Sequence, residues 1–320
     1  MEKIAVLTSG GDAPGMNACI RAVVRAGIKL DYEMYVVYEG YKGLVEGLIE
    51  KVDRNFVSDI ITRGGTILDT ARLPEFKEEK VQKIAVSQLE KLGIKNLIVI
   101  GGDGTYRGAK DLARFNINVV GIPASIDNDI VSTEYCIGFD TCQNTICECV
   151  DKIRDTTASH NRCTFIEVMG NKCGDLALYS GLAEGVEIVV SNEHPYDEDR
   201  ITKKLLKLKG GKKKHSLVVV AEKIFPNIHE LAERITKKTG IECRATVLGH
   251  IQRGGSPTAK DRVIATRFGV EAIKAIKDGE KAVALGLFKD EIKRTPFEKA
   301  FNSKRCAHDD LLEILKLVNR

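Results

Sequence analysis

Residues 97–109 read LIVIGGDGTYRGA, so a short apolar run passes through a glycine-rich turn into a segment of helical period. An apolar run of this length without alternation is typical of a strand that helices cover on both faces. Glycines at the junction allow a tight change from strand to helix. The stretch therefore predicts one strand–turn–helix unit of a parallel α/β sheet.

The same succession recurs along the chain, first up to residue 123 and again after residue 140. Apolar runs that predict strands are found at residues 3–8, 34–38, 97–102, 119–123, 164–170, 187–190, 217–222 and 245–250. Helical patterns start at about Met16, just after Gly104 and at about Asn227. Others precede Gly93, cover residues 141–159, pass through Leu178 and lie near Leu205. We expect an α/β protein with two doubly wound, Rossmann-like, three-layer α/β/α domains.

Composition excludes several classes of protein. The chain has 320 residues, 43% hydrophobic and 29% charged, with a net charge of +4 spread along its length. These values favour a packed globular protein and give no reason to expect a nucleic-acid or membrane partner. The basic run KGGKKKH, from Lys209 to His215, fits a solvated turn better than a patch for a polyanionic polymer.

The N-terminal residues and the cysteines indicate the compartment. The segment MEKIAVLTSGGD lacks the pattern of a secretory signal, and the nine cysteines are odd in number. We expect a cytoplasmic protein with reduced thiols. Cys142, Cys147 and Cys149 match no zinc spacing and are interpreted as small hydrophobic residues.

Six loops carry most of the candidate chemistry, and all but one come at or near the ends of predicted strands. Ligands of doubly wound sheets bind beyond the carboxyl ends of strands, which makes these loops candidates for a site. They are TSGGDAPGMN (8–17), RGGT (63–66), GGDGT (101–105), PASIDND (123–129), MGNKCGD (169–175) and GHIQRGGSP (249–257).

Two of the glycine-rich loops suit phosphate. The loop from Ser9 to Gly15 leads into a helix, whose first amides can bind anionic oxygens, although a plain tight turn explains it equally well. It is neither a Walker motif nor a dinucleotide fingerprint. In GGDGT, Asp103 suits Mg²⁺, and the alternative is an N-cap of the following helix.

The loop PASIDND brings Asp127, Asn128 and Asp129 together. One aspartate near a bound phosphoryl group could accept a hydroxyl proton while the other orients metal or substrate. Asx-turn chemistry, in which these side chains bond to nearby amides, is the alternative, and spacing alone leaves the choice open.

Taken together, ten stretches of this sequence resemble the bacterial ATP-dependent 6-phosphofructokinases over essentially the whole chain. These stretches are LTSGGDAPGMN (7–17), RGGT (63–66), TAR (70–72), IGGDGTYRGA (100–109), SIDND (125–129), GFDT (138–141), IRDT (153–156), VMG (168–170), TVLGHIQRGGSP (246–257) and DR (261–262). The resemblance implies transfer of the γ-phosphoryl group of ATP, with Mg²⁺, to the 1-hydroxyl of fructose 6-phosphate. It also implies a homotetramer with sites shared between subunits, an ATP-binding domain at 1–138 plus about 251–301, and a sugar-binding domain at 139–250 plus about 302–320.

The resemblance also assigns the site residues. Asp127 is the expected catalytic base, and Asp103 is the expected metal ligand. The expected ATP site consists of Gly11, Arg72, Leu73, Gly102, Asp103, Gly104 and Thr105. The expected substrate site consists of Ser125, Ile126, Asp127, Asp129, Met169, Gly170, Asn171, Glu222, His250, Ile251, Gln252 and Arg253, with Arg162 and Arg244 reaching the 6-phosphate bound by a neighbouring subunit.

A second anion site is suggested by Arg21 and Arg25, which lie four residues apart and so share one helix face. Solvated surface charge is the alternative. The resemblance implies an effector site for ADP activation and phosphoenolpyruvate inhibition, with Glu187 as a metal ligand for the effector nucleotide. Its residues are 21–25 (Arg21, Ala22, Val23, Val24, Arg25), 54–59 (Arg54, Asn55, Phe56, Val57, Ser58, Asp59), Arg154, 185–187 (Gly185, Val186, Glu187), Gly211, Lys213, Lys214 and His215.

Two small residues, Gly104 and Ala124, favour ATP over pyrophosphate. Pyrophosphate-using relatives typically carry Asp and Lys at the equivalents of these positions, where the side chains fill the space of the ATP α-phosphate. A pyrophosphate-dependent enzyme and a non-catalytic, metabolite-sensing paralogue are the rival hypotheses. The first is disfavoured by Gly104, and the second by the presence of Asp103 and Asp127.

The sequence departs from the family pattern at two positions that matter. Position 171, usually Arg, is Asn171, and the lost charge-assisted contact of about 1.5–3 kcal/mol predicts transfer slower by about ten- to hundred-fold. We therefore expect Asn171→Arg to raise kcat. Position 211, usually Arg, is Gly211, which weakens the case for an effector response.

Overall fold

The chain folds into two compact units in the computed structural model, which describes residues 1–211, 213–303 and 308–318. Within that part, the first unit holds 1–126, 130–141 and 253–303, and the second holds the remainder, including 127–129. The expected domain ranges had placed 127–129 in the first domain. The expected final segment, 302–320, includes 304–307 and 319–320, which lie outside the described residues.

The described part of the first unit contains a seven-stranded sheet in the order β11-β10-β5-β4-β1-β2-β3. Its central pairs are parallel, whereas the edge strands β3 and β11 are antiparallel to their neighbours. The order reverses between β1 and β4, which makes the crevice beyond their carboxyl ends the expected ligand position. The strands are β1 (Lys3–Ser9), β2 (Glu33–Val37), β3 (Ile49–Val52), β4 (Asn96–Gly101), β5 (Asn118–Pro123), β10 (Val283–Phe288) and β11 (Glu291–Pro296).

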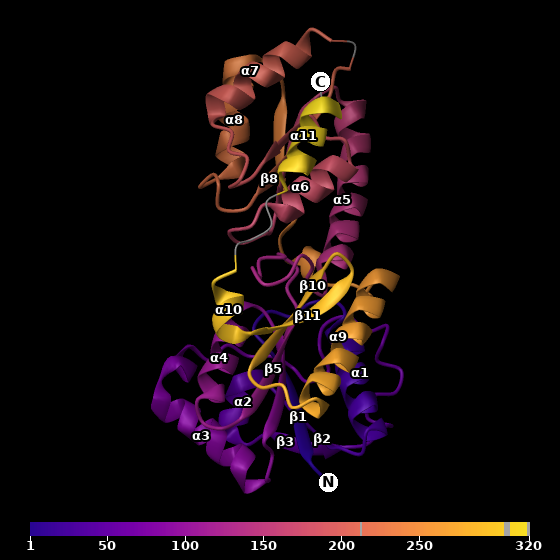
Figure 1. Cartoon of the computed structure of the whole chain (residues 1–320). Coiled ribbons are helices and arrows are strands. Elements are labelled where there is room, and N and C mark those ends of the chain that lie inside the picture. The colour runs from indigo at the N-terminus through magenta and orange to yellow at the C-terminus, as the bar shows by residue number, and fades with distance from the viewer. Residues whose placement is uncertain (212, 304–307, 319–320) are drawn as a thin grey trace. The chain divides into compact units, whose positions relative to one another are not determined.

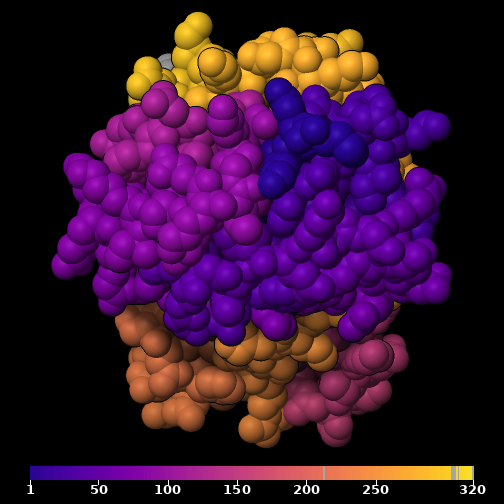
Figure 2. Space-filling model, turned by 90° about the horizontal axis from the view of Figure 1, so that it is seen from below, coloured from indigo at the N-terminus to yellow at the C-terminus, as the bar shows by residue number. Residues whose placement is uncertain are grey.

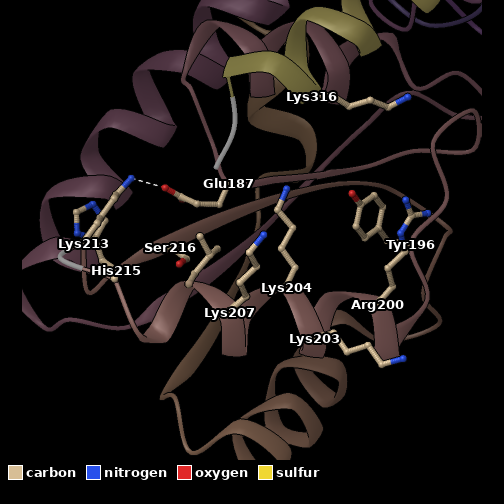
Figure 3. A pocket seen from close by; sticks show the side chains of 12 residues that line it. Glu187, Tyr196, Arg200, Lys203, Lys204, Lys207, Lys213, His215, Ser216 and Lys316 are labelled. Atoms are coloured by element: carbon tan, nitrogen blue, oxygen red, sulfur yellow. Dashed lines mark hydrogen bonds and ion pairs between the residues drawn. The ribbon is translucent and has the colours of Figure 1, made fainter.

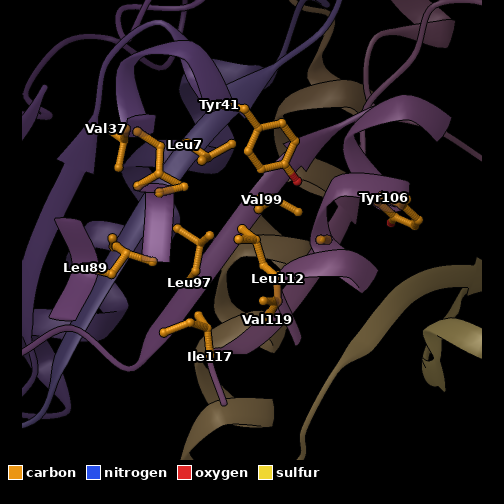
Figure 4. Close-up of a cluster of buried hydrophobic side chains, with 14 of the residues drawn as sticks. Leu7, Val37, Tyr41, Leu89, Leu97, Val99, Tyr106, Leu112, Ile117 and Val119 are labelled. Carbon is orange, nitrogen blue, oxygen red and sulfur yellow. The ribbon is translucent and has the colours of Figure 1, made fainter. Parts of the chain in front are cut away.

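Helices cover both faces of this sheet, as the apolar strands predicted (Figure 1). One face carries α1 (Met16–Lys29) and α9 (Ala259–Lys277), which pack closely on each other. The other face carries α2 (Gly40–Glu46), η1 (Pro74–Lys77), α3 (Glu79–Lys91), α4 (Asp103–Ala113) and α10 (Phe297–Phe301). Alternate strand residues such as Leu7 and Val99 meet Leu89 and Leu112 of these helices in one apolar core (Figure 4).

The second unit repeats the three-layer plan on a smaller, all-parallel sheet of order β7-β8-β6-β9 in its described residues. Its strands are β6 (Cys163–Val168), β7 (Ile188–Val190), β8 (Ser216–Ala221) and β9 (Cys243–Val247). Helices α7 (Glu198–Lys209) and α8 (Ile228–Thr239) cover one face, and α5 (Phe139–Ser159), α6 (Asp175–Ala183) and α11 (Asp309–Val318) the other. A short turn, η2 (Gly249–Arg253), follows β9. The predicted two-domain α/β fold is thereby confirmed.

Two of the quoted motifs, GFDT and DR, are joined by a buried carboxylate. Asp261 in the first turn of α9 is fully buried and accepts hydrogen bonds from the amides of Gly138 and Thr141, both at 2.9 Å. It also accepts from the Thr141 hydroxyl at 2.5 Å and from Tyr135 at 2.9 Å. Asp261 therefore fixes the start of α5 to the start of α9, a structural role.

The surface and the thiols agree with a globular protein. In the space-filling view the N-terminal residues, in indigo, lie on the surface of the first unit (Figure 2), where Met1 is 80% exposed. No helix among the described residues is long and apolar enough to span a membrane. Eight described cysteines are free thiols, and Cys142 is buried as expected, while Cys147 and Cys149 are partly exposed.

Candidate active site

Three predicted loops of the first unit emerge side by side. Strand β4 pairs with β1 through Gly101 opposite Ser9, and with β5 through Gly101 opposite Pro123. The amide of Ala124 continues this pairing by donating to the Gly101 carbonyl oxygen at 3.1 Å. The loops after β1, β4 and β5 therefore leave the same edge of the sheet together, at its switch point.

The loop after β4 leaves space and open amides at the start of α4. The N-cap of α4 is Gly102, whose backbone is extended and whose position has no side-chain cap. A Cβ atom added to Gly102 or Gly104 would meet no atom within 4 Å. Helix N-termini with uncapped amides and free space beside them are able to bind anions, so this loop stays a candidate for phosphate.

Asp103 and Thr105 in this loop have different roles. Asp103 is the first residue of α4, exposed, and accepts from Arg107 Nε at 2.8 Å, so the N-cap explanation for it is wrong. The Thr105 hydroxyl is buried and donates to the Ser9 carbonyl oxygen at 2.8 Å. Thr105 therefore holds the loops after β1 and β4 together, and only its backbone is available to a nucleotide.

The loop after β1 touches a residue predicted for the sugar. A Cβ atom on Gly11 would lie 2.7 Å from Nη1 of Arg253, so the guanidinium group rests on the Gly11 backbone. The RGGT loop is fixed nearby, because Asn17 on α1 donates to the Arg63 and Gly64 carbonyl oxygens at 3.1 and 3.2 Å. This loop follows the edge strand β3, which explains why no preceding apolar strand was recognised.

The remaining nucleotide candidates lie beyond this loop. Residues 69 and 70 are tied to β1 and its loop, because the Thr8 hydroxyl donates to the Asp69 carbonyl oxygen at 3.1 Å and the Thr70 hydroxyl donates to the Gly10 carbonyl oxygen at 2.8 Å. Arg72 is exposed, whereas Leu73 is half-buried and packs on the apolar core. Arg72 is free to reach a ligand, and the Leu73 side chain serves packing.

The segment after β5 carries the candidate base. Ala124 and Ile126 are 1% exposed, Ser125 is partly exposed, and Asp127 is 9% exposed. Asn128 has a left-handed backbone and donates to Asp175 Oδ2 at 2.9 Å, so it anchors the loop on α6. Asn128 therefore has an anchoring role, and the bond goes to a carboxylate 47 residues later, not to a nearby amide as in the Asx turn that had been the alternative.

Asp129 belongs to a polar chain that ends on a lysine. Asn171 Nδ2 lies 3.4 Å from Asp129 Oδ2, and Asn171 Oδ1 accepts from Lys223 Nζ at 3.0 Å. The Asn171 amide donates to Glu222 Oε1 at 2.9 Å. Lys223 thus brings a positive charge next to Asn171, where the family pattern expects Arg, and no motif in the sequence had pointed to Lys223.

The predicted sugar residues of the second unit gather at the carboxyl edge of its sheet. Met169, Gly170 and Asn171 follow β6, while Glu222 follows the neighbouring strand β8. Turn η2, with exposed His250 and Ile251, is tied to β6 by buried Gln252, whose Oε1 accepts from the Met169 amide at 3.0 Å. Gln252 positions this turn instead of facing a ligand.

Arg162 and Arg244 lie at the opposite, amino edge of the same sheet. Arg162 directly precedes β6, and Arg244 is the second residue of β9, opposite Thr164. Both approach Glu242, with nitrogen–oxygen distances of 3.5 and 2.8 Å. At about 3.3 Å per residue, Arg162 is about 23 Å from Met169 along the strand, and Arg244, opposite Thr164, is about 17 Å from it.

The predicted effector residues form one group in each unit. In the first unit the pKa of Arg25 is lowered by burial and by Arg21 and Arg54, while Asp59 raises it, so these four charges lie together. The Arg25 Nε atom is buried without a hydrogen-bond partner. Ala22, Val23, Val24 and Val57 are buried, so their side chains serve packing, while Asn55 and Ser58 are exposed and Phe56 is half-buried.

In the second unit the group surrounds Glu187, which is 8% exposed. Lys213 Nζ donates to one of its oxygens, and the Leu217 amide donates to the other at 2.8 Å. Arg154 donates to Glu184 Oε2 at 2.8 Å, Gly185 has a left-handed backbone and Val186 is buried. The Glu187 carboxylate is already used by protein donors, so the expected metal there would have to displace Lys213.

Comparisons with known proteins agree with this geometry. The family model described as "Phosphofructokinase" matches residues 3–276. The chain is 47% identical, over the full length of both proteins, to an ATP-dependent 6-phosphofructokinase 1 of Clostridium perfringens, and 49% identical to an ATP-dependent 6-phosphofructokinase of Macrococcus caseolyticus over 98% of each.

Solved structures give the same result for the fold. The phosphofructokinase of Saccharomyces cerevisiae superposes with a TM-score of 0.90 at 32% identity, over 98% of this chain and 50% of the yeast chain, so this chain spans about half of that one. A pyrophosphate-dependent phosphofructokinase of Marinobacter aquaeolei, 17% identical with a TM-score of 0.85 over 98% of this chain and 91% of its own, shares the fold alone. The chain belongs to the phosphofructokinase family.

Proposed function

We propose that this protein is an ATP-dependent 6-phosphofructokinase, which transfers the γ-phosphoryl group of ATP to the 1-hydroxyl of fructose 6-phosphate. The observation that carries the proposal is the adjacency of the loops after β4 and β5, joined by the Ala124 amide at 3.1 Å from the Gly101 carbonyl oxygen. One loop offers an uncapped helix start for phosphate, and the other leads within three residues to the carboxylate of Asp127.

The donor is proposed to be ATP because of the space at Gly104. A side chain at this position would project into a region without protein atoms, so the glycine leaves room for a larger phosphate chain. The printed names of the bacterial relatives point the same way. Pyrophosphate as donor is the second candidate, and an aspartate at position 104 would have favoured it.

Asp127 is proposed to take the proton of the attacking hydroxyl as the phosphoryl group transfers. A base of this kind contributes about 10²- to 10⁴-fold to rate, while backbone amides at Gly102–Gly104 and Arg72 stabilise the phosphoryl oxygens. Asp129, oriented by Asn171, supports the same reacting centre. A non-catalytic paralogue would have no need of a buried carboxylate so soon after a phosphate-binding loop.

The metal is proposed to be Mg²⁺, with Asp103 as its protein ligand. The described residues hold no group of three or more metal-ligating side chains. A single carboxylate suits Mg²⁺, which keeps water and substrate phosphate in its remaining positions and neutralises phosphoryl charge when bound. Asp103 is exposed and shared only with Arg107 across one helical turn, so it fits this task.

A homotetramer with shared sites is proposed from the position of Arg162 and Arg244. They lie at the amino edge of the sheet that carries the other sugar residues at its carboxyl edge, so they suit the 6-phosphate of a second chain. Mixing inactive Arg162→Ala with inactive Asp127→Ser tests this, because hybrid assemblies contain a site with both functional residues. No recovered activity in the mixture would contradict a shared site.

Regulation by ADP and phosphoenolpyruvate, in a cytoplasmic glycolytic enzyme, completes the proposal. Its support is the cluster of Arg21, Arg25 and Arg54 with an unsatisfied Arg25 Nε atom, since an anion would satisfy that donor. Fructose 6-phosphate saturation curves that do not move with either effector would remove this part alone.

The decisive test of the activity measures fructose 1,6-bisphosphate formation with ATP or pyrophosphate as donor. We expect turnover with ATP, and a fall of about 10²- to 10⁴-fold in kcat for Asp127→Ser. Asp155→Ser, at an exposed position of α5, is the matched control and should leave kcat unchanged. Full activity of Asp127→Ser would remove the base, and turnover with pyrophosphate alone would change the donor.

A further inference from the structure

Two cysteines of the second unit lie side by side at the amino edge of its sheet. Cys163 is the first residue of β6, Cys243 is the first residue of β9, and the parallel register pairs them directly. Neighbouring strands run about 4.8 Å apart. Because disulfides join Cα atoms that are about 4.4–6.8 Å apart, the backbone already holds these residues at a suitable separation.

Both cysteine side chains lie on the face of the sheet that α7 and α8 cover. They belong to one apolar cluster with Leu205 of α7 and Ile235 of α8. Ser216, the residue of β8 opposite Cys163, lines a pocket beside α7, and Figure 3 shows it next to Lys207 of that helix. Register partners in a sheet share a face, so the position of Ser216 agrees with that of Cys163.

The two thiols are in contact and are chemically different. The Cys243 thiol donates to the Ile241 carbonyl oxygen at 3.3 Å, and its sulfur accepts a hydrogen bond from the Cys163 thiol. That bond, together with burial, raises the pKa of Cys163, and it lowers the pKa of Cys243 against the opposing effect of burial. Because the thiolate is the reactive form of cysteine, Cys243 is the more reactive of the two.

Cys243 is also the more accessible thiol. It is 8% exposed on β9, the edge strand of the described sheet, whereas Cys163 is fully buried on the neighbouring strand β6. Both thiols are free in the structure. A small oxidant therefore meets Cys243 first, and Cys163 lies where it can close a disulfide.

The pair is flanked by the two arginines proposed for the sugar 6-phosphate. Arg162 directly precedes Cys163, and Arg244 directly follows Cys243. Successive side chains of a strand point to opposite faces, and Arg162 donates to the Thr156 hydroxyl of α5 at 3.2 Å, on the face away from α7. A disulfide bond of about 2.05 Å is shorter than any hydrogen bond, so it would draw together the backbone that carries both arginines.

We propose that Cys163 and Cys243 are a modification site, at which hydrogen peroxide forms a reversible disulfide that weakens the hold of Arg162 and Arg244 on the sugar phosphate. The disulfide follows from the register and contact of the two cysteines alone. Its effect on the arginines rests on the proposed function, because it needs the roles given to them there.

The reaction has two steps. The Cys243 sulfur attacks one oxygen of the peroxide, the O–O bond breaks, and the departing hydroxide takes the Cys243 proton and leaves as water, so that a sulfenic acid remains. The Cys163 sulfur then attacks the sulfenic sulfur, the S–O bond breaks, and the second hydroxide takes the Cys163 proton and leaves as water. Two thiols lose two electrons in total, and one peroxide molecule is reduced to two water molecules. A thiol reductant reverses the change by exchange.

Mass spectrometry of the folded full chain tests the disulfide. After exposure to hydrogen peroxide and alkylation of the remaining thiols, trypsin releases residues 163–172 and 239–244, each with one cysteine. We expect these peptides to be linked in wild type and in Cys149→Ala, a control that removes a partly exposed thiol of α5, and to separate after dithiothreitol. They should not be linked in Cys243→Ala. Absence of the linked peptides from peroxide-treated wild type would overturn the proposal, as would their appearance only in protein unfolded by urea.

Saturation kinetics with fructose 6-phosphate on the same samples test the effect on the arginines. Peroxide should raise KM by about three- to tenfold in wild type and Cys149→Ala, because displaced charge-assisted contacts are weakened, and dithiothreitol should restore it. In Cys243→Ala no reversible change is expected; the wild-type comparison holds even if this variant folds poorly. An unchanged KM in a sample with linked peptides would overturn the effect on the arginines. Failure of the kinase assay with linked peptides present would contradict the proposed function, and with it the effect on KM, while the disulfide would stand.

Discussion

The replacement of Lys223 by glutamine tests whether Lys223 supplies the positive charge that arginine usually supplies at position 171. The Lys223 ammonium group donates to the Asn171 side chain at 3.0 Å, and the amide group of that side chain lies 3.4 Å from Asp129. We infer that Lys223 polarises and orients Asn171, and adds positive charge beside the transferring phosphoryl group. Lys223→Gln should therefore lower kcat.

The size of the effect follows from exposure. A buried charge-assisted contact would be worth about 1.5–3 kcal/mol, but the Lys223 side chain is 63% exposed and solvent screens it. A value of about 0.5–1 kcal/mol remains, which corresponds to a fall of about two- to fivefold in kcat. Lys223 also reduces the gain expected of Asn171→Arg below the estimate made from the sequence alone.

The assay is a double-mutant cycle on kcat, with Asn171→Arg, Lys223→Gln and the combination of both. Lys223→Gln should lower kcat when Asn171 is present. It should lower kcat much less in the Asn171→Arg background, where the introduced guanidinium group supplies the charge. Lys172→Gln, an exposed neighbour, is the control and should change nothing. Equal effects of Lys223→Gln in both backgrounds, or none in either, would refute the reasoning.

Three further predictions test other parts of the structure. Gly104→Asp should lower kcat/KM for ATP by about 100-fold or more without changing the melting temperature, because the new side chain contacts no protein atom and projects into the space proposed for ATP. Unchanged ATP kinetics would contradict the proposal that Gly104 leaves room for ATP. Asp261→Asn should lower the free energy of unfolding, measured in urea, by about 2–4 kcal/mol, because the new side-chain NH₂ group would face the Thr141 N–H group, and both are donors. A change below about 0.5 kcal/mol would contradict this. Gly11→Ala should raise the KM for fructose 6-phosphate at nearly constant stability, because the methyl group displaces the flexible end of Arg253; an unchanged KM would leave Arg253 without a substrate role.

Most strands that are buried on both faces could be predicted, although β10 (VALGLF), which is equally apolar and buried, was missed together with the preceding helix α9. Runs such as residues 97–101 contain no polar residue, so they fit only a fully buried segment, and a helical pattern follows each run at a regular distance. The antiparallel edge strands β3 (IEKV) and β11 (EIKRTP) escaped prediction because they are partly exposed and carry few apolar residues. Each of them forms by pairing with the adjacent strand of the sheet, and the periodicity of its own residues does not reveal that pairing.

The site could be predicted in its loops but not in its side-chain partners. The resemblance named Asn171 as a departure, yet nothing local pointed to Lys223, which lies 52 residues later. Its ammonium group reaches Asn171 because β6 and β8 are neighbours and because the Lys223 backbone is left-handed, with φ at 67°. Likewise, the anchoring of Asn128 on Asp175 depends on where α6 begins, and spacing alone could not separate it from catalysis.

The predicted strands alone also contain an argument about assembly. Arg162 stands just before the strand expected at 164–170, and Arg244 just before that expected at 245–250, whereas Met169 and His250 close the same strands. Because both strands are parallel, the two arginines must share one edge of the sheet and the other two residues the opposite edge, about 20 Å away. A sugar phosphate bound at one edge therefore does not reach the backbone at the other edge. If all four residues serve one kind of substrate, as the resemblance implies, strand direction favours two arginines that contact a molecule held by another chain.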